Sequence, residues 1–231
     1  MMTATEIIKQ LEALGSPENL AGMARYGIST ARSFGVKAAD IKALSRRYKG
    51  DQALALTLWA SGYRDARILA TYIADPQAFT PKQMDAWVAN VDSWDVCDAA
   101  ANQLFRRSPH ALNRALAWSR AEPQFTRRAG FALMAGLALQ SSPLPDDAYE
   151  PFLERIQAAA TDRRNMVNKA VNWALRQIGK RNPALNARAI AVAEDLAAMN
   201  SPTARWIAAD ALKELRSEKV QERLQDNGGH P

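Results

Sequence analysis

Cysteine and histidine are scarce in this sequence. Its 231 residues include one cysteine, Cys97, and two histidines, His110 and His230. One cysteine cannot form an internal disulfide, and so few thiols and imidazoles provide no cluster with the spacing of zinc ligands. We therefore expect a reduced, cytoplasmic protein with no metal and no cofactor.

Several motifs of common enzyme classes are also missing. No Walker-type or dinucleotide-binding glycine loop occurs, and there is no Gly-x-Ser-x-Gly elbow. With two histidines, a Ser-His-Asp or Cys-His mechanism is not expected. No apolar stretch is long enough for a membrane span, and residues 1–14 form an amphipathic pattern rather than a signal peptide. If the chain is an enzyme, its chemistry must use carboxylates, aromatic rings and cations.

Positive charge is concentrated in one part of the chain. The formal net charge is +6, yet residues 103–189 alone contain fourteen Arg or Lys and six Asp or Glu. Such a concentration favours a surface that faces a polyanion. The alternative is that these cations cover ordinary solvated helix faces.

The pattern of residues favours helices over strands throughout. Alanine is abundant, runs of β-branched residues are absent, and turn signals such as Ser16-Pro17, Asn182-Pro183 and Ser201-Pro202 separate helical segments. Similar segments, a basic residue before an alanine-rich apolar run, recur at steps of HEAT-repeat length. We expect an all-α, HEAT-like helical-repeat solenoid with a concave basic face. Residues 1–216 should form a single domain and 217–231 a frayed or disordered tail.

The segment around Trp173 carries an aromatic ring on a basic helix face. An apolar stripe occupies one side of the predicted helix: Val167, Val171, Ala174 and Ile178. The opposite side carries Trp173 among Lys169, Arg176 and Lys180. A tryptophan among cations suits stacking on a sugar or base. The alternative is that a neighbouring repeat or subunit covers the ring.

A second candidate is the segment 91–98, Val-Asp-Ser-Trp-Asp-Val-Cys-Asp. Asp92 or Ser93 can cap a helix and Asp95 lies in its first turn, which explains these residues structurally. Asp98 instead shares the face of Trp94 and interrupts an apolar stripe. Because burying an unpaired carboxylate is costly, Asp98 needs either an arginine partner or a function.

A third candidate is Arg127-Arg128 at the beginning of a predicted helix. Arg128 shares its face with Ala132 and Ala135, small residues that should leave the guanidinium unobstructed. A phosphate contact and an ordinary surface arginine are both consistent with this pattern.

Together these residues resemble a known family. Trp94-x-x-x-Asp98, then Arg128, then Lys169-Ala-Val-x-Trp173-x-Leu-Arg176 are similar to the motifs of the bacterial DNA alkylation repair glycosylases of the AlkD type. The resemblance covers nearly the whole chain, from Arg25-Tyr26 to about Leu215, and its three motifs occur in order. It implies a HEAT-like-repeat DNA glycosylase.

The resemblance also implies roles for particular residues. Asp98 would be the catalytic carboxylate, Trp94 and Trp173 the aromatics that flank the deoxyribose of the lesion, and Arg128 a contact to the DNA backbone. Members of the family excise N3- and N7-alkylated purines from double-stranded DNA without inserting the base into a pocket. The expected DNA contacts are Lys169, Arg176, Lys180, Arg127 and Tyr26.

Two other functions remain compatible with the sequence. One is a non-catalytic protein that binds DNA structures through the same basic surface. The other is a helical-repeat scaffold for protein interactions, in which the two tryptophans anchor a partner. In all three cases we expect no membrane association. We also expect a monomer, because an open solenoid that grips a duplex needs no second subunit.

Overall fold

Helices make up all the regular structure in the described parts of the chain. The structure, a computed structural model, describes residues 2–139 and 143–228, and no strand occurs in these ranges. The all-α prediction is therefore confirmed. No helix in the described ranges is long and apolar enough to cross a lipid bilayer.

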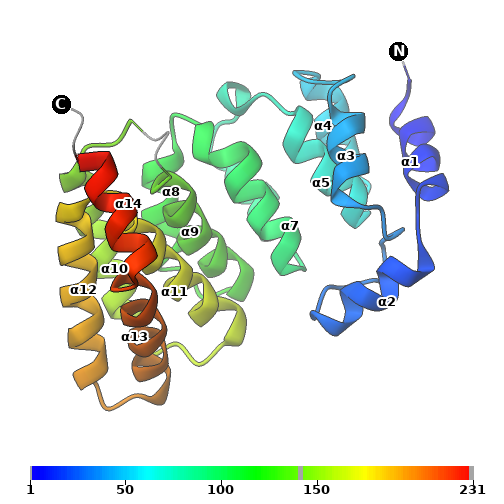
Figure 1. Cartoon of the computed structure of the whole chain (residues 1–231). Coiled ribbons are helices and arrows are strands. Elements are labelled where there is room, and N and C mark those ends of the chain that lie inside the picture. The colour runs from blue at the N-terminus through cyan, green and yellow to red at the C-terminus, as the bar shows by residue number, and fades with distance from the viewer. Residues whose placement is uncertain (1, 140–142, 229–231) are drawn as a thin grey trace. The chain divides into compact units, whose positions relative to one another are not determined.

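The chain divides into two compact units, residues 1–110 and 111–231. The first contains α1 (Ala4–Ala13), α2 (Pro17–Arg25), α3 (Ala38–Ser45), α4 (Gln52–Ala60), α5 (Arg64–Ile73), α6 (Pro81–Ala89) and α7 (Trp94–Ala99) (Figure 1). Three short elements complete it: the 3₁₀ turns η1 (Pro76–Ala78) and η3 (Phe105–Arg107), and the π-helical η2 (Ala100–Leu104).

Within residues 111–139 and 143–228, the second unit contains three helix pairs and a final helix. Its elements are α8 (Ala111–Trp118), α9 (Gln124–Leu137), the 3₁₀ turn η4 (Asp146–Tyr149), α10 (Glu150–Ala159), α11 (Asn165–Gly179), α12 (Pro183–Ala198), α13 (Pro202–Leu215) and α14 (Glu218–Gly228). α11 packs against both α9 and α13, so the second helices of successive pairs lie side by side. The single domain expected over residues 1–216 stays a prediction, since that range is shared between the two units.

Proline at the first helical position marks several helix starts. Pro17, Pro183 and Pro202 each begin a helix, and the residue before each caps it with a side-chain oxygen. Proline fits there because its missing N–H needs no partner in the first turn. These two Ser-Pro pairs and the Asn-Pro pair are therefore N-terminal helix caps.

An aromatic cluster forms part of the core of the first unit. The rings of Trp59 and Trp87 stack with their centroids 4.0 Å apart. Phe79 meets the edges of both Trp87 and Phe105. Because Phe105 comes from η3 and Trp59 from α4, this cluster fixes the helix that bears Asp98 to the body of the unit.

Close helix packing in the second unit depends on a missing side chain. A Cβ atom added to Gly130 in α9 would lie 2.4 Å from the backbone nitrogen of Ser119, at the end of α8. Only glycine permits this approach. The glycine at this position therefore allows α8 and α9 to pack closely.

The prediction for the C-terminal tail was wrong over most of its length. Residues 218–228 form α14, and the side chains of Val220 and Leu224 are buried. These two residues lie four apart, on one side of a helix, and contribute the apolar contact that holds an otherwise polar segment. Residues 229–231 lie outside the described ranges.

Candidate nucleic-acid interface

Trp94 and Asp98 lie one turn apart on α7, and both are partly buried. Four residues of helix bring side chains to the same side, so the indole and the carboxylate share a face, as the sequence predicted. Ser93 occupies the N-cap position but its hydroxyl donates to Asp95 instead of accepting from the helix. Asp95 in turn pairs with Arg64 of α5, 2.6 Å from its Nε. The first turn of α7 is thus anchored to α5.

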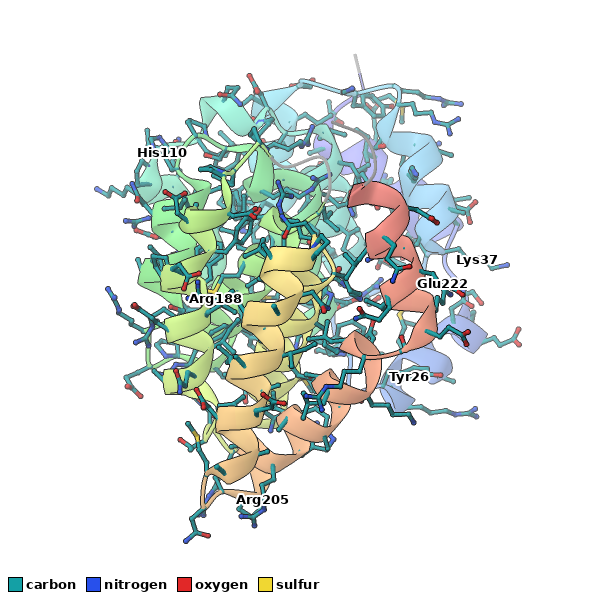
Figure 2. The ribbon with its side chains drawn as sticks, turned by 60° about the vertical axis from the view of Figure 1, so that its left-hand side comes forward. Tyr26, Lys37, His110, Arg188, Arg205 and Glu222 are labelled. Atoms are coloured by element: carbon teal, nitrogen blue, oxygen red, sulfur yellow. The ribbon has the colours of Figure 1, made fainter. Side chains whose placement is uncertain are left out.

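Tyr26 is brought to Trp94 by a hydrogen bond of its backbone. The indole Nε1 of Trp94 donates to the carbonyl oxygen of Tyr26 at 3.0 Å. Tyr26 follows the last residue of α2 and its side chain is 75% exposed (Figure 2). The structure therefore brings together Tyr26, Trp94 and Asp98, three of the residues predicted for the site, within the first unit.

A buried carboxylate organises the loop that supports α2. Asp65 is completely buried and accepts hydrogen bonds from the backbone nitrogens of Phe34 and Val36, at 2.7 and 3.1 Å. The same loop holds α2, because the carbonyl of Phe34 accepts from the backbone nitrogen of Ser16. Asp65 also accepts from Arg64, the partner of Asp95. One arginine therefore links this loop to the helix of Trp94.

The helix widens directly after Asp98. Residues 100–104 are π-helical, and the backbone carbonyls of Asp98 and Asn102 accept hydrogen bonds from side chains. Asn102 Nδ2 donates to the carbonyl of Asp98 at 2.9 Å, and Arg106 Nε donates to that of Asn102 at 2.6 Å. In a π-helical turn the backbone N–H groups donate to the carbonyl five residues back rather than four. The side chains of Asn102 and Arg106 donate to carbonyls that the backbone N–H groups of a regular α-helix would use.

In the second unit, Arg128 is buried rather than exposed. Its guanidinium donates to the carbonyl oxygen of Met166 at 2.6 Å, and only 6% of the residue is accessible. The expectation of an unobstructed guanidinium was therefore wrong: Ala132 and Ala135 lie in the core, and they leave space that the packing of α11 against α9 fills.

Arg127 is held in an ion-pair network. Its Nη1 lies 3.0 Å from Asp162, which also pairs with Arg164 at 2.6 Å. The hydrogen bond from Arg164 is the main reason why the pKa of Asp162 is lowered, with Arg127 adding to the effect against the cost of burial. Asp162 is thus ionised and ties Arg127, in the first turn of α9, to the segment between α10 and α11. A DNA contact by Arg127 stays a prediction.

Trp173 lies on α11 beside cations that already have a partner. Arg176 and Lys180 both contact Glu214 of α13, each at 2.6 Å. Burial opposes ionisation of Glu214, but the hydrogen bond and charge of Lys180, together with Arg176, outweigh it and lower its pKa. Lys169 is exposed, and Trp173 is partly buried rather than part of the core. The positive charge of this face is therefore smaller than the sequence of α11 alone suggests.

Sequence reasoning missed Glu214, because it lies 38 residues after Arg176 and its partner depends on how α13 packs. A phosphate would compete with this carboxylate for the same cations. We expect Glu214→Gln to bind unmodified duplex DNA more tightly and to steepen the dependence of log affinity on log salt, by up to about 0.9 for each additional phosphate that the protein neutralises. Fluorescence anisotropy titrations over a range of salt concentrations would measure both quantities.

Glu154→Gln is the matched control, because it changes the net charge by the same amount and Glu154 is exposed on α10. If affinity rises equally in the two variants, the increase reflects net charge, and Glu214 does not compete with DNA.

Comparisons with known proteins identify the fold and the family of the chain. A solved structure with 22% sequence identity matches 96% of this chain and 96% of its own, with a TM-score of 0.77. It is described as representing a new family of proteins related to the HEAT-like repeat DNA glycosylases, with affinity for branched DNA structures. At this identity the likeness shows the fold, and the expected HEAT-like repeat fold is confirmed.

A second solved structure is a designed armadillo repeat protein in complex with a peptide. It is 15% identical, covers 82% of this chain and 80% of its own, and has a TM-score of 0.35, which is too low to indicate a shared fold. No curated protein matches the sequence. The family model of the DNA alkylation repair enzymes, however, matches residues 7–222, which is nearly all of the chain. The chain therefore belongs to the DNA alkylation repair enzyme family.

Proposed function

We propose that this chain is a DNA glycosylase that hydrolyses the N-glycosidic bond of cationic N3- and N7-alkylated purines in duplex DNA. It would act without inserting the base into a pocket and leave an abasic site. The observation that carries the proposal is the arrangement on α7, where a partly buried carboxylate, Asp98, shares a helix face with Trp94. The indole is fixed through the backbone of the exposed Tyr26.

The chemistry of the lesion matches these side chains. Alkylation at N3 or N7 makes the purine a cationic leaving group, which departs as a neutral base and needs no general acid. Positive charge then develops on the sugar as an oxocarbenium ion. A carboxylate such as Asp98 stabilises this charge or orients the attacking water, and the face of Trp94 attracts the cationic ring.

We assign contacts with DNA to both units. In the second unit, Lys169 is exposed and Trp173 is partly accessible, which suits a phosphate contact and a stacking contact. For Arg128 the assignment is narrower. Because only 6% of Arg128 is accessible, its guanidinium can reach a phosphate only if the DNA backbone lies directly against the first turns of α9 and α11.

The second candidate function is binding of DNA structures without catalysis. The observation in its favour is the solved relative with the same fold, which is described by its affinity for branched DNA. A protein of this kind would use the same cations and aromatic rings. It would not require the carboxylate of Asp98.

Release of 7-methylguanine or 3-methyladenine from alkylated duplex DNA tests the proposal directly. The wild-type protein should release free base in single-turnover reactions without added metal. Binding to a four-way junction and to a linear duplex of equal length should be measured in parallel. If no base is released and the junction is bound more tightly, the second function is correct. Duplex binding that does not weaken with salt would instead favour a protein scaffold.

A further inference from the structure

The first unit contains a strongly cationic pocket in addition to the site of Trp94 and Asp98. Its volume is about 300 Å³, and it lies where the end of α3 meets α5 and η3. The side chains that define it are five cations and a phenol: Lys42, Arg46, Lys49, Arg106, Arg107 and Tyr72. None of the lining residues is acidic.

The sequence builds this pocket from two short basic segments. Lys42 lies in the last turn of α3, Arg46 is the C-cap of that helix, and Lys49 lies in the turn that follows; all three line the pocket. Arg106 and Arg107 form the last turn of η3. Three of the five cations lie outside the basic stretch 103–189, so the charge pattern of the sequence did not reveal the cluster.

These cations have no carboxylate partner within the described residues. The ion pairs there involve other arginines and lysines. Burial and the like charge of Arg106 lower the pKa of Arg107, while Asp75 nearby acts in the opposite direction. The dipole of a helix C-terminus supplies only about half a negative charge. Most of the positive charge in the pocket is therefore uncompensated.

A second cavity shows how unusual this composition is. The cavity of about 490 Å³ beside Lys180 is also lined by charged residues, but there the signs balance. Its cations are Lys180, Lys219 and Arg223, and its acids are Glu214, Glu222 and Asp226. Like charges gathered without counter-charges cost stability, and an anionic ligand removes that cost when it binds.

We infer that the pocket of Lys42, Arg46, Lys49, Arg106 and Arg107 binds a backbone phosphate of DNA. The inference rests on the proposed function for the identity of the ligand. Arg106 donates through Nε to the protein, and its two terminal nitrogens have no protein partner among the described residues, so they are available to the oxygens of a phosphate. The hydroxyl of Tyr72 offers a further donor.

The position of the pocket relates it to the reaction site. Arg106 lies eight residues after Asp98 on one continuous helical segment, a distance of about 12 Å at 1.5 Å per residue. At about 3.4 Å per nucleotide along one strand, this corresponds to roughly three to four nucleotides. The pocket would thus fix the duplex at a phosphate roughly three to four nucleotides from the lesion and set which nucleotide faces Asp98.

The test compares two double variants with equal net charge. Lys42→Gln/Lys49→Gln removes two cations of the pocket, while Lys9→Gln/Lys82→Gln removes two exposed lysines from α1 and α6 of the same unit. Anisotropy titrations with an unmodified duplex, between about 50 and 200 mM salt, give affinity and salt slope. We expect the pocket variant to lose about 0.9 to 1.8 from the slope and about tenfold in affinity at low salt, relative to the control pair. Equal slopes and affinities for the two pairs would overturn the inference.

Two further measurements separate the remaining explanations. Equal melting temperatures of both double variants would show that the loss of binding does not come from unfolding; if the pocket variant melts early, Arg46→Gln alone, with its exposed side chain, replaces it. Inorganic phosphate at constant ionic strength identifies the source of the anion. If the pocket holds a DNA phosphate, inorganic phosphate should weaken DNA binding by the wild type more than by the pocket variant, because both anions compete for the same cations. Phosphate that binds the wild type without weakening its DNA binding would mean a free phosphate site and overturn the assignment to DNA.

The binding assay uses unmodified DNA, so it does not depend on catalysis. If the salt slope falls as expected while the wild-type protein releases no alkylated base, the pocket stands and the proposed glycosylase activity fails. If base is released and the pocket variant binds like its control, the proposed glycosylase activity stands and the assignment of the pocket fails.

Discussion

Replacing Asp98 by asparagine should slow the release of 7-methylguanine at least tenfold, which corresponds to about 1.4 kcal/mol in the barrier. The two side chains have nearly the same shape, so the change removes the negative charge without creating a cavity, and it places an amide donor where one carboxylate oxygen was. That charge matters only as the sugar becomes cationic, and its loss therefore raises the barrier more than it weakens binding. Single-turnover release from alkylated duplex, with binding of unmodified duplex measured alongside, separates the two effects.

Asp92→Asn is the matched control for this experiment. Asp92 lies just before the same helix, but its side chain is 66% exposed and lies 3.4 Å from Arg67. This variant should release base at the wild-type rate. If Asp98→Asn does the same, the carboxylate has no catalytic role, whatever the wild-type protein does.

The helical fold could be predicted from the sequence because its signals are local. Ser16-Pro17, Asn182-Pro183 and Ser201-Pro202 each fix a helix start through one side-chain cap and one proline ring. The final helix has a weaker local signal. Among its many charged residues, Val220 and Leu224 provide the buried contact, and their value depends on the surface that they meet. A pattern of two apolar residues does not reveal such a surface.

The candidate site could likewise be predicted from the sequence only where its signals are local. Trp94 and Asp98 share a face because a helix repeats every 3.6 residues, and the sequence alone establishes that. Sequence could not predict that Glu214 pairs with both Arg176 and Lys180, since it comes from a helix that begins 26 residues after Arg176. Nor could it predict the burial of Arg128 against the carbonyl of Met166. Local periodicity gives the direction of a side chain, whereas its partners depend on tertiary packing.

The support of Trp94 also depends on a tertiary contact, and its removal should have a second large effect. Asp65→Ala should lower the free energy of unfolding by about 3–5 kcal/mol, the range for removing one partner from a buried ion pair. The substitution leaves Arg64 with one carboxylate instead of two. It also leaves the buried backbone nitrogens of Phe34 and Val36 without their acceptor. Urea denaturation would measure the loss.

Asp40→Ala is the control for stability, because Asp40 lies in the first turn of α3 and belongs to none of the ion pairs within the described residues. It should change the free energy of unfolding by no more than about 0.5 kcal/mol. Asp65→Asn should fall between the two, because the amide keeps one acceptor oxygen but places a donor against another N–H. A loss below about 1 kcal/mol for Asp65→Ala would contradict this role.

Replacing Asp65 should also affect the candidate site, and Asp65→Asn is the variant that tests this effect. The loop that Asp65 organises holds α2 through the carbonyls of Phe34 and Gly35. Tyr26 directly follows α2, and its carbonyl fixes the indole of Trp94. At a temperature where Asp65→Asn remains folded, we therefore expect slower base release with Asp98 still in place. Because the chain has six tryptophans, the fluorescence of Trp94 is obtained by difference from a Trp94→Phe variant, and it should report a more mobile indole. Full activity in a destabilised but folded Asp65→Asn protein would show that the reaction does not depend on how Trp94 is held.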